Sequence, residues 1–198
     1  MDDLSLIRRA QAGDSTSFAE LLDLYYETIH RFAWKWCGHA ANADDIAQQA
    51  CIKLATSLPQ YRFQAAFTSW LYRLVISCAQ DWQRTQTRHV HHELPETEPA
   101  PGADDAENSI YLLQLLGQLE RLGEGMKETA LLVHAEGLSH ADAGVILGVS
   151  ESTISWRRLS TSNVISALGN SRSTISRICS ADGLKAPTLL ADNVSRPR

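Results

Sequence analysis

The segment from residue 136 to residue 158 constrains the fold more than any other part of this chain. Gly137 and Gly148 stand where a helix can end in the left-handed conformation that glycine adopts most readily. Ser139 and Ser150 follow them by two residues, and each can cap the next helix with its side-chain oxygen. This spacing predicts two short helices joined by a tight turn, which is a helix-turn-helix.

Small and apolar residues fit the angle between these two helices. Gly144 leaves room where the backbones cross, and Ile154 is expected to point back into the angle. Further apolar contacts are predicted from Leu138, Ile146, Leu147 and Val149. The second helix then presents a polar outer face suited to the major groove of duplex DNA. The residues predicted on that face are Ser152, Thr153, Ser155, Trp156 and Arg157.

Two alternatives apply to this segment. Ordinary helical hairpins inside a core also use glycine turns, so the pattern alone does not require DNA. The bulk of Trp156 would equally suit packing against a leucine-rich helix predicted near residues 112–119.

Length and composition favour a globular protein without membrane insertion. The chain has 198 residues, of which 44% are apolar, and no run approaches the roughly 18 apolar residues of a membrane span. The first residues, MDDLSLIRRAQAGD, lack the basic-then-apolar order of a secretory signal. A cytoplasmic location is therefore expected.

The cysteines and histidines predict neither disulfides nor a metal site. No C-x-x-C pair occurs among Cys37, Cys51, Cys78 and Cys179, so free thiols are expected. Cys37 with His39 is a weak metal signal. The histidines His89, His91 and His92 lie in a stretch that reads as a solvated linker. No cofactor is predicted.

The distribution of charge along the chain is more informative than the net charge of −5. Residues 89–111 carry six acidic residues and no Lys or Arg, whereas residues 1–88 carry nine of each sign. Residues 89–108 also contain three prolines and little that could be buried, which is typical of a flexible linker. The sequence therefore predicts two bodies joined by an acidic connector.

Helical periodicity dominates the remainder, and no strand-like alternation is found, so the predicted fold is all-α. Amphipathic helices are expected over residues 4–12, 17–37, 44–57, 67–88 and 124–136, with another beginning near residue 110. Ser17 and Glu20 are a possible capping box for the second of these. Residues 170–198 show no clear period and are predicted to be a disordered tail.

Three stretches, in order, resemble bacterial sigma factors of the extracytoplasmic-function (ECF) type. FTSWLYRLVISCAQDWQR is similar to the family pattern F-x-x-W-L-Y-R-I-A-x-N-x-x-x-D-x-x-R, with Trp70, Arg73 and Asp81 in place. NADDIAQQACIKL resembles D-A-E-D-L-x-Q-E-x-F, and residues 136–157 resemble the helix-turn-helix pattern of the family's second module. The resemblance covers residues 4–169.

The resemblance implies a domain organisation and a function. Residues 1–88 would be sigma region 2, residues 89–108 the acidic linker, and residues 109–169 sigma region 4, followed by the tail 170–198. The implied protein is not an enzyme but an alternative sigma factor. It would bind core RNA polymerase, direct it to specific promoters and assist promoter melting at transcription initiation. The alternative is a stand-alone helix-turn-helix transcription regulator.

Site residues follow from the matched motifs. The resemblance implies minus-ten DNA binding by Tyr61, Arg62, Phe63, Gln64, Trp70, Arg73, Ser77, Gln80, Arg84 and Arg88. It implies polymerase binding by Asp45, Gln48, Gln49 and Lys53, and minus-thirty-five DNA binding by the five residues named above. For Tyr61 and Phe63, core packing is an equally good interpretation. No catalytic residue and no metal ligand is predicted.

Partners and geometry follow as well. Expected partners are core RNA polymerase, promoter DNA and an anti-sigma factor, with the chain a monomer when free of them. A flexible 20-residue linker spans about 25 Å on average. Promoter elements two duplex turns apart are separated by roughly 70 Å. Polymerase would therefore have to hold the two modules apart, and the free chain would bind promoters poorly.

One departure from the family pattern concerns the core of the second helix. Arg158 falls where an apolar residue is expected, on the face shared by Ile154 and Ile165. Either Arg158 extends outward to solvent, or the helix rotates so that Leu159 fills the gap.

Overall fold

The computed structural model describes residues 3–89 and 103–167, and these residues form helices and turns only. The first module consists of α1 (Asp3–Gln11), α2 (Ser15–Cys37), α3 (Ala40–Ser57), a 3₁₀ turn at Leu58–Gln60 and α4 (Phe67–His89). The second consists of α5 (Ala103–Arg121), α6 (Met126–Ala130), a π turn at Leu131–Ala135, α7 (His140–Leu147) and α8 (Glu151–Ala167). The all-α prediction is confirmed.

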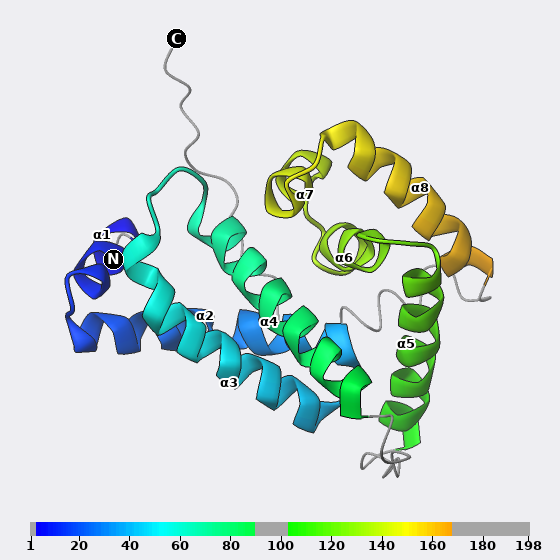
Figure 1. Ribbon diagram of the computed structural model, residues 1–198, viewed down its shortest axis with the longest axis horizontal. Helices are drawn as coiled ribbons and strands as arrows, with labels where there is room; N and C mark the ends of the chain where they lie inside the picture. Colours follow the sequence, from blue (N-terminus) through cyan, green and yellow to red (C-terminus); the bar gives the residue numbers. More distant parts are fainter. Residues whose placement is uncertain (1–2, 90–102, 168–198) are drawn as a thin grey trace.

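The first module is built on the long helix α2, against which α1, α3 and α4 pack (Figure 1). Asp14 caps this helix by accepting a hydrogen bond from the backbone N–H of Thr16 at 3.0 Å. The Ser17 hydroxyl also donates to the Asp14 carboxylate, at 2.6 Å. The predicted capping box of Ser17 and Glu20 is therefore wrong, because Asp14 offers an acceptor one turn earlier.

In the second module the helix-turn-helix has the predicted caps. Gly137 and Gly148 have φ values of 69° and 68°, and the Ser139 hydroxyl accepts from the N–H of Asp142 at 3.0 Å. Ser150 accepts from the N–H of Thr153 at 3.2 Å. Local sequence thus determines both helix starts.

Several helix boundaries differ from those expected. α3 begins at Ala40 rather than near residue 44, and α5 begins at Ala103, inside the stretch expected to be linker. Between Met126 and Ala135 the helix changes to a π turn before it reaches the helix-turn-helix. Residues 90–102, the rest of the expected linker, and the predicted tail lie outside the described residues.

The two modules pack against each other. One apolar core cluster includes Phe32 and Ile76 of the first module and Leu112, Leu132 and Ile146 of the second. In Figure 1, α6 and α7 lie beside α4, with α5 next to them. The sequence predicted two bodies without predicting this contact.

The close crossing at Gly144 gives a stability prediction. A Cβ atom placed there would lie 2.9 Å from the carbonyl oxygen of Val149, which belongs to the backbone of the turn. We expect Gly144→Ala to lower the free energy of unfolding by about 1–3 kcal/mol, because the crossing is overpacked.

The matched control is Gly117→Ala in α5, where a Cβ would meet nothing within 4 Å. This variant should be more stable than the wild type by about 0.5–1 kcal/mol, since alanine favours a helix interior. Chemical unfolding monitored by circular dichroism measures both changes. Equal effects of the two substitutions would contradict the close crossing.

Candidate functional site

A loop of aromatic side chains precedes α4. Tyr61 is buried, and its hydroxyl donates to the carbonyl of Ala65 at 2.7 Å. The ring centroid of Tyr61 lies 4.7 Å from that of Phe63 and 5.3 Å from that of Trp70. Of the two interpretations offered for Tyr61, the structure favours core packing, because this ring is buried and packs against the rings of Phe63 and Trp70.

Phe63 has a backbone conformation that is unusual for its type. It is the one residue other than glycine with a positive φ, 57°, among those described. The guanidinium carbon of Arg8 lies 5.3 Å from its ring centroid, a cation–π contact. Arg62 and Gln64 on either side are exposed. Backbone strain of this kind is common at ligand-binding sites, and here it holds a half-buried ring beside two exposed polar side chains.

The predicted minus-ten residues on α4 divide into two groups. Arg73 and Gln80 face the second module: Arg73 Nε donates to the Ile146 carbonyl at 2.9 Å, and Gln80 donates to Glu128 at 2.9 Å. Ser77 instead accepts a hydrogen bond from Lys53 of α3 at 2.8 Å.

Two further arginines lie near the end of α4. Arg84 is exposed and forms an ion pair with Asp81 at 3.1 Å. The side chain of Arg88 lies outside the described residues. The helix thus presents its polar residues in two directions rather than one.

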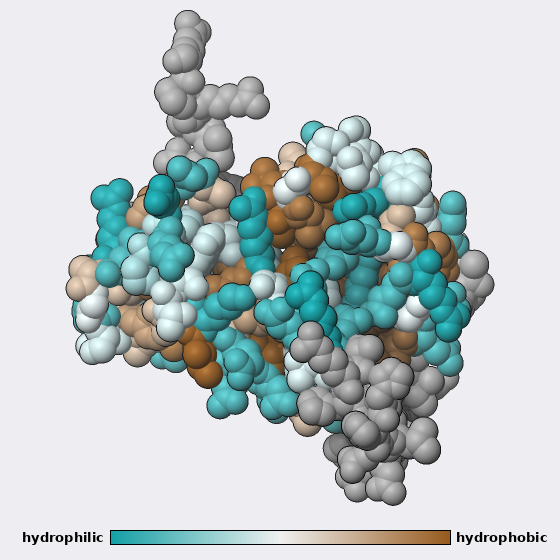
Figure 2. All heavy atoms as spheres, in the orientation of Figure 1, coloured by the Kyte–Doolittle hydropathy of each residue, from teal (hydrophilic) through white to brown (hydrophobic). Residues whose placement is uncertain are grey.

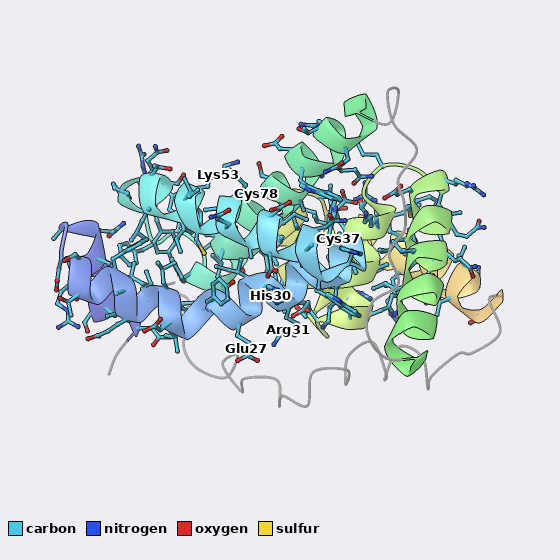
Figure 3. All side chains as sticks on the ribbon, turned by 90° about the horizontal axis from the view of Figure 1, so that it is seen from below. Glu27, His30, Arg31, Cys37, Lys53 and Cys78 are labelled. Carbon is cyan, nitrogen blue, oxygen red and sulfur yellow. The ribbon has the colours of Figure 1, made fainter. Side chains whose placement is uncertain are left out.

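A groove of about 580 Å³ runs between α3 and α4. It is lined by all four residues predicted to bind polymerase, Asp45, Gln48, Gln49 and Lys53. Its lining also includes Trp82, whose indole N–H is buried without an acceptor in the described part of the chain. Figure 3 shows Lys53 and Cys78 close together where the two helices meet. Trp82 was not among the residues that the sequence predicted to bind polymerase.

The outer face of α8 is only partly free. Ser152 is exposed and Trp156 is 60% exposed, so the alternative in which Trp156 packs against the leucine-rich helix is wrong. Thr153 bonds to Ser150, and Ser155 lies 3.0 Å from the His140 ring. Ser152, Thr153, Ser155 and Trp156 all lie in the first two turns of α8.

The two arginines of α8 have different environments. The guanidinium of Arg157 lies against Gly125 at the start of α6, and this side chain is half-buried. Arg158 extends to solvent, and Leu159 is 63% exposed, so Leu159 does not fill the core position. Thr161 and Ile165 are buried instead. The expectation that Arg158 could extend outward is confirmed.

A buried ionic cluster joins the modules, and the sequence did not predict it. The Glu136 carboxylate accepts hydrogen bonds from Lys35 at 2.8 Å, Arg31 at 3.1 Å and the Tyr72 hydroxyl at 2.7 Å. Lys35 also donates to the Ala135 carbonyl at 3.1 Å. No local signal could identify this cluster, since the bonds that join its two halves link residues 64 to 105 positions apart in the chain.

The electrostatics of Glu136 follow from these contacts. Burial raises the pKa of its carboxyl group, but the charges of Lys35 and Arg31 and the hydrogen bonds from Lys35 and Tyr72 outweigh that effect. The pKa of Glu136 is therefore lowered below its ordinary value. Burial also raises the pKa of Tyr72, so its hydroxyl stays a donor.

Thiols and other metal-binding side chains offer no second site in the described residues. Cys37, Cys51 and Cys78 are free, and burial raises the pKa of Cys37 to about 11. No group of three or more His, Cys, Asp or Glu side chains there is placed to hold a metal ion. No helix among the described residues is long and apolar enough to cross a membrane.

Comparisons with known proteins agree with the arrangement of the helices. Residues 21–89 match the family model of sigma-70 region 2. The chain is 28% identical over 155 residues to the ECF RNA polymerase sigma factor SigM of Mycobacterium tuberculosis, and this alignment covers 78% of each chain. It is 26% identical over 164 residues to the ECF RNA polymerase sigma factor SigW of Bacillus subtilis, covering 76% of this chain and 88% of SigW.

Two solved structures share the fold. CnrH in complex with the cytosolic domain of CnrY superposes with a TM-score of 0.62 at 19% identity, covering 82% of this chain and 94% of that one. The sigma factor RpoE of Bartonella quintana, in complex with the anti-sigma factor NepR, gives 0.59 at 21% identity, covering 76% and 95%.

The region 2 helices and the capped helix-turn-helix together define a transcription initiation factor of the sigma-70 class. Within that class, the chain is similar to ECF sigma factors over more than three quarters of its length.

The lowered pKa of Glu136 gives a pH prediction. A carboxyl group with a depressed pKa contributes stability above its unfolded pKa and loses it as pH falls through the folded pKa. At pH 7, Glu136→Gln should lower the free energy of unfolding by about 3 kcal/mol, because the buried Lys35 and the partly buried Arg31 lose their counter-charge. Below about pH 4.5 the difference between variant and wild type should shrink.

Chemical unfolding of both proteins at a series of pH values measures that difference directly. The control Glu124→Gln changes an exposed carboxylate of the same module and should show little difference at any pH. A cost of Glu136→Gln that does not depend on pH would contradict the assignment.

Proposed function

We propose that this chain is an alternative sigma factor that binds core RNA polymerase, directs it to specific promoters and assists promoter melting. The observation that carries the proposal is the match of residues 21–89 to sigma-70 region 2, followed in the same chain by a correctly capped helix-turn-helix. The relatives cover both modules, which favours a sigma factor over a stand-alone regulator. It would act in the cytoplasm, without enzymatic activity of its own.

The domain assignment proposed for these activities is that of the sequence. Residues 1–88 act as sigma region 2 and residues 109–169 as sigma region 4, with 89–108 connecting them. Minus-ten DNA meets the aromatic loop and α4, while minus-thirty-five DNA meets α8. The anti-sigma factor bound by RpoE of Bartonella quintana supports an anti-sigma partner here as well.

The aromatic loop supplies the chemistry of melting. The half-buried Phe63 ring stands between exposed Arg62 and Gln64, so an unstacked base can stack on the ring while its backbone phosphate meets Arg62. One stacked base contributes about 1–3 kcal/mol, which is comparable to the few kcal/mol needed to flip it out. Tyr61 supports the ring from below.

The groove between α3 and α4 is the proposed polymerase surface. Its lining offers amide and carboxylate groups together with the indole of Trp82, whose N–H has no acceptor in the described part of the chain. An amphipathic element of the polymerase could place apolar side chains against this indole and hydrogen-bond to Gln48 and Gln49.

Run-off transcription tests the proposal. Core polymerase is incubated with and without the purified chain on a library of genomic fragments, and discrete new transcripts are expected only with it. Co-migration of the chain with core polymerase is measured in parallel. The absence of both new transcripts and co-migration would overturn the proposed function.

Phe63→Ala should reduce open-complex formation about 5- to 150-fold, which corresponds to loss of one stacking contact. Permanganate reactivity of unpaired thymines measures it, with polymerase binding followed separately. The matched control is Tyr26→Ala, which removes an exposed aromatic ring from α2 and should melt promoters normally. Equal melting by Phe63→Ala and the control would contradict the role of this ring.

The groove gives a second variant test. The double substitution Gln48→Ala/Gln49→Ala should weaken binding to core polymerase by about tenfold, since two interfacial hydrogen bonds of roughly 0.5–1.5 kcal/mol each are lost. The control Gln114→Ala/Gln118→Ala removes two exposed glutamines from α5 and should bind as the wild type does. Fluorescence anisotropy with labelled chain measures both affinities.

A further inference from the structure

Two polar contacts tie the helix-turn-helix module to the surfaces that region 2 would offer to a promoter. The first is Glu136, whose side chain is 3% exposed and lies between Lys35 and Arg31 of α2 and Tyr72 of α4. All three partners belong to the first module. Figure 3 shows Arg31 extending from α2 on the side where α2 meets the second module.

The second contact occupies Arg73. Its guanidinium donates to the carbonyls of Val145 and Ile146, in the last turn of α7. Carbonyl groups at the end of a helix lack partners within the helix and favour a cation. A residue proposed to bind the minus-ten element is therefore bound to the helix-turn-helix instead.

The arrangement of the modules conflicts with simultaneous binding of two promoter elements. Elements two duplex turns apart are separated by roughly 70 Å. In this structure the polar face of α4 is within hydrogen-bond distance of α7, which is half of the helix-turn-helix. The chain as it stands can engage at most one element.

We propose that this structure is a closed, autoinhibited state, and that the buried carboxylate of Glu136 is the lock that holds the second module over α2 and α4. The inference rests on the proposed function, because autoinhibition has meaning only for a chain that must reach two promoter elements. Opening separates Glu136 from Lys35 and Arg31 and releases Arg73 for DNA.

The physical reason is an asymmetry between the two states. In the closed state, removing the carboxylate leaves the buried Lys35 and the partly buried Arg31 without a counter-charge, which is strongly unfavourable. In the open state the same side chains are hydrated, so their charges cost little. Loss of Glu136 thus shifts the equilibrium toward opening rather than unfolding either module.

In the wild type, by contrast, the free-energy cost of separating Glu136 from its partners is small enough for the chain to open. The attraction within a buried ion cluster largely offsets the desolvation of its members, so its net contribution is modest. A partner that binds both modules in the open state can therefore open the chain. Core polymerase, which would hold the modules apart, is such a partner.

The test measures the distance between the modules in the full chain. Probes are attached through non-natural amino acids at Ala55 of α3 and Asn163 of α8, both exposed. Pulsed electron spin resonance should give one short distance for the wild type. Glu136→Gln should shift the closed-to-open ratio by about a hundredfold, to mainly long distances. Glu124→Gln, the matched control, should stay closed.

A second variant distinguishes opening from misfolding. Lys35→Met added to Glu136→Gln removes one unpaired buried cation and supplies an apolar side chain, so the short distance should return in part. A damaged module would not be repaired by this change. Far-ultraviolet circular dichroism, which reports the helix content of the modules, should be unchanged in all variants.

Core polymerase provides an independent measurement. Its addition to the labelled wild type should lengthen the distance, and Glu136→Gln should bind promoter DNA without polymerase at least tenfold more tightly than the wild type. A short distance in Glu136→Gln, or an already long distance in the free wild type, would overturn the lock. Failure of run-off transcription with an intact opening response would overturn the proposed function alone.

Discussion

The carboxylate of Glu136 is the point on which the relation between the two halves of the chain depends. It stands at the end of the π turn that leads into the helix-turn-helix, and it is surrounded by Lys35, Arg31 and Tyr72 of the other half. A buried charge must be paired, so the second module cannot slide or rotate over α2 without separating these groups. The orientation of the DNA-binding helices relative to α4 follows from this one set of contacts.

Around Glu136, apolar packing supplies the contact area between the modules, and polar contacts fix their relative orientation. The core cluster runs without a break from Phe32 through Leu132 to Ile154. Apolar area is non-directional, whereas the bonds of Arg73 to the end of α7 select a particular register. The space-filling view in Figure 2 shows hydrophobic surface over α7 beside the second module's polar residues, where Val145 is 47% exposed. Opening would enlarge this apolar surface.

The candidate surfaces differ in how readily the sequence reveals them. Asp45, Gln48, Gln49 and Lys53 could be placed on one face from helical spacing, and they line one groove. The resemblance put Arg73 and Ser77 together in the minus-ten set, yet they bond to different helices, because side chains four residues apart can turn to different neighbours. Tyr61 and Phe63 look alike in the sequence, and only packing makes one a support and the other half-exposed.

The sequence by itself determined the helix-turn-helix, its caps and the resemblance to ECF sigma factors, because these depend on residues a few positions apart. Ser139 and Ser150 cap their helices wherever the module lies, and Gly144 fits only a close crossing. The tertiary structure alone decided that the modules close on each other. Lys35 and Glu136 are 101 residues apart, and nothing near either indicates the other. Only the folded structure shows such a pairing, because a charge that is buried on folding requires an opposite charge beside it.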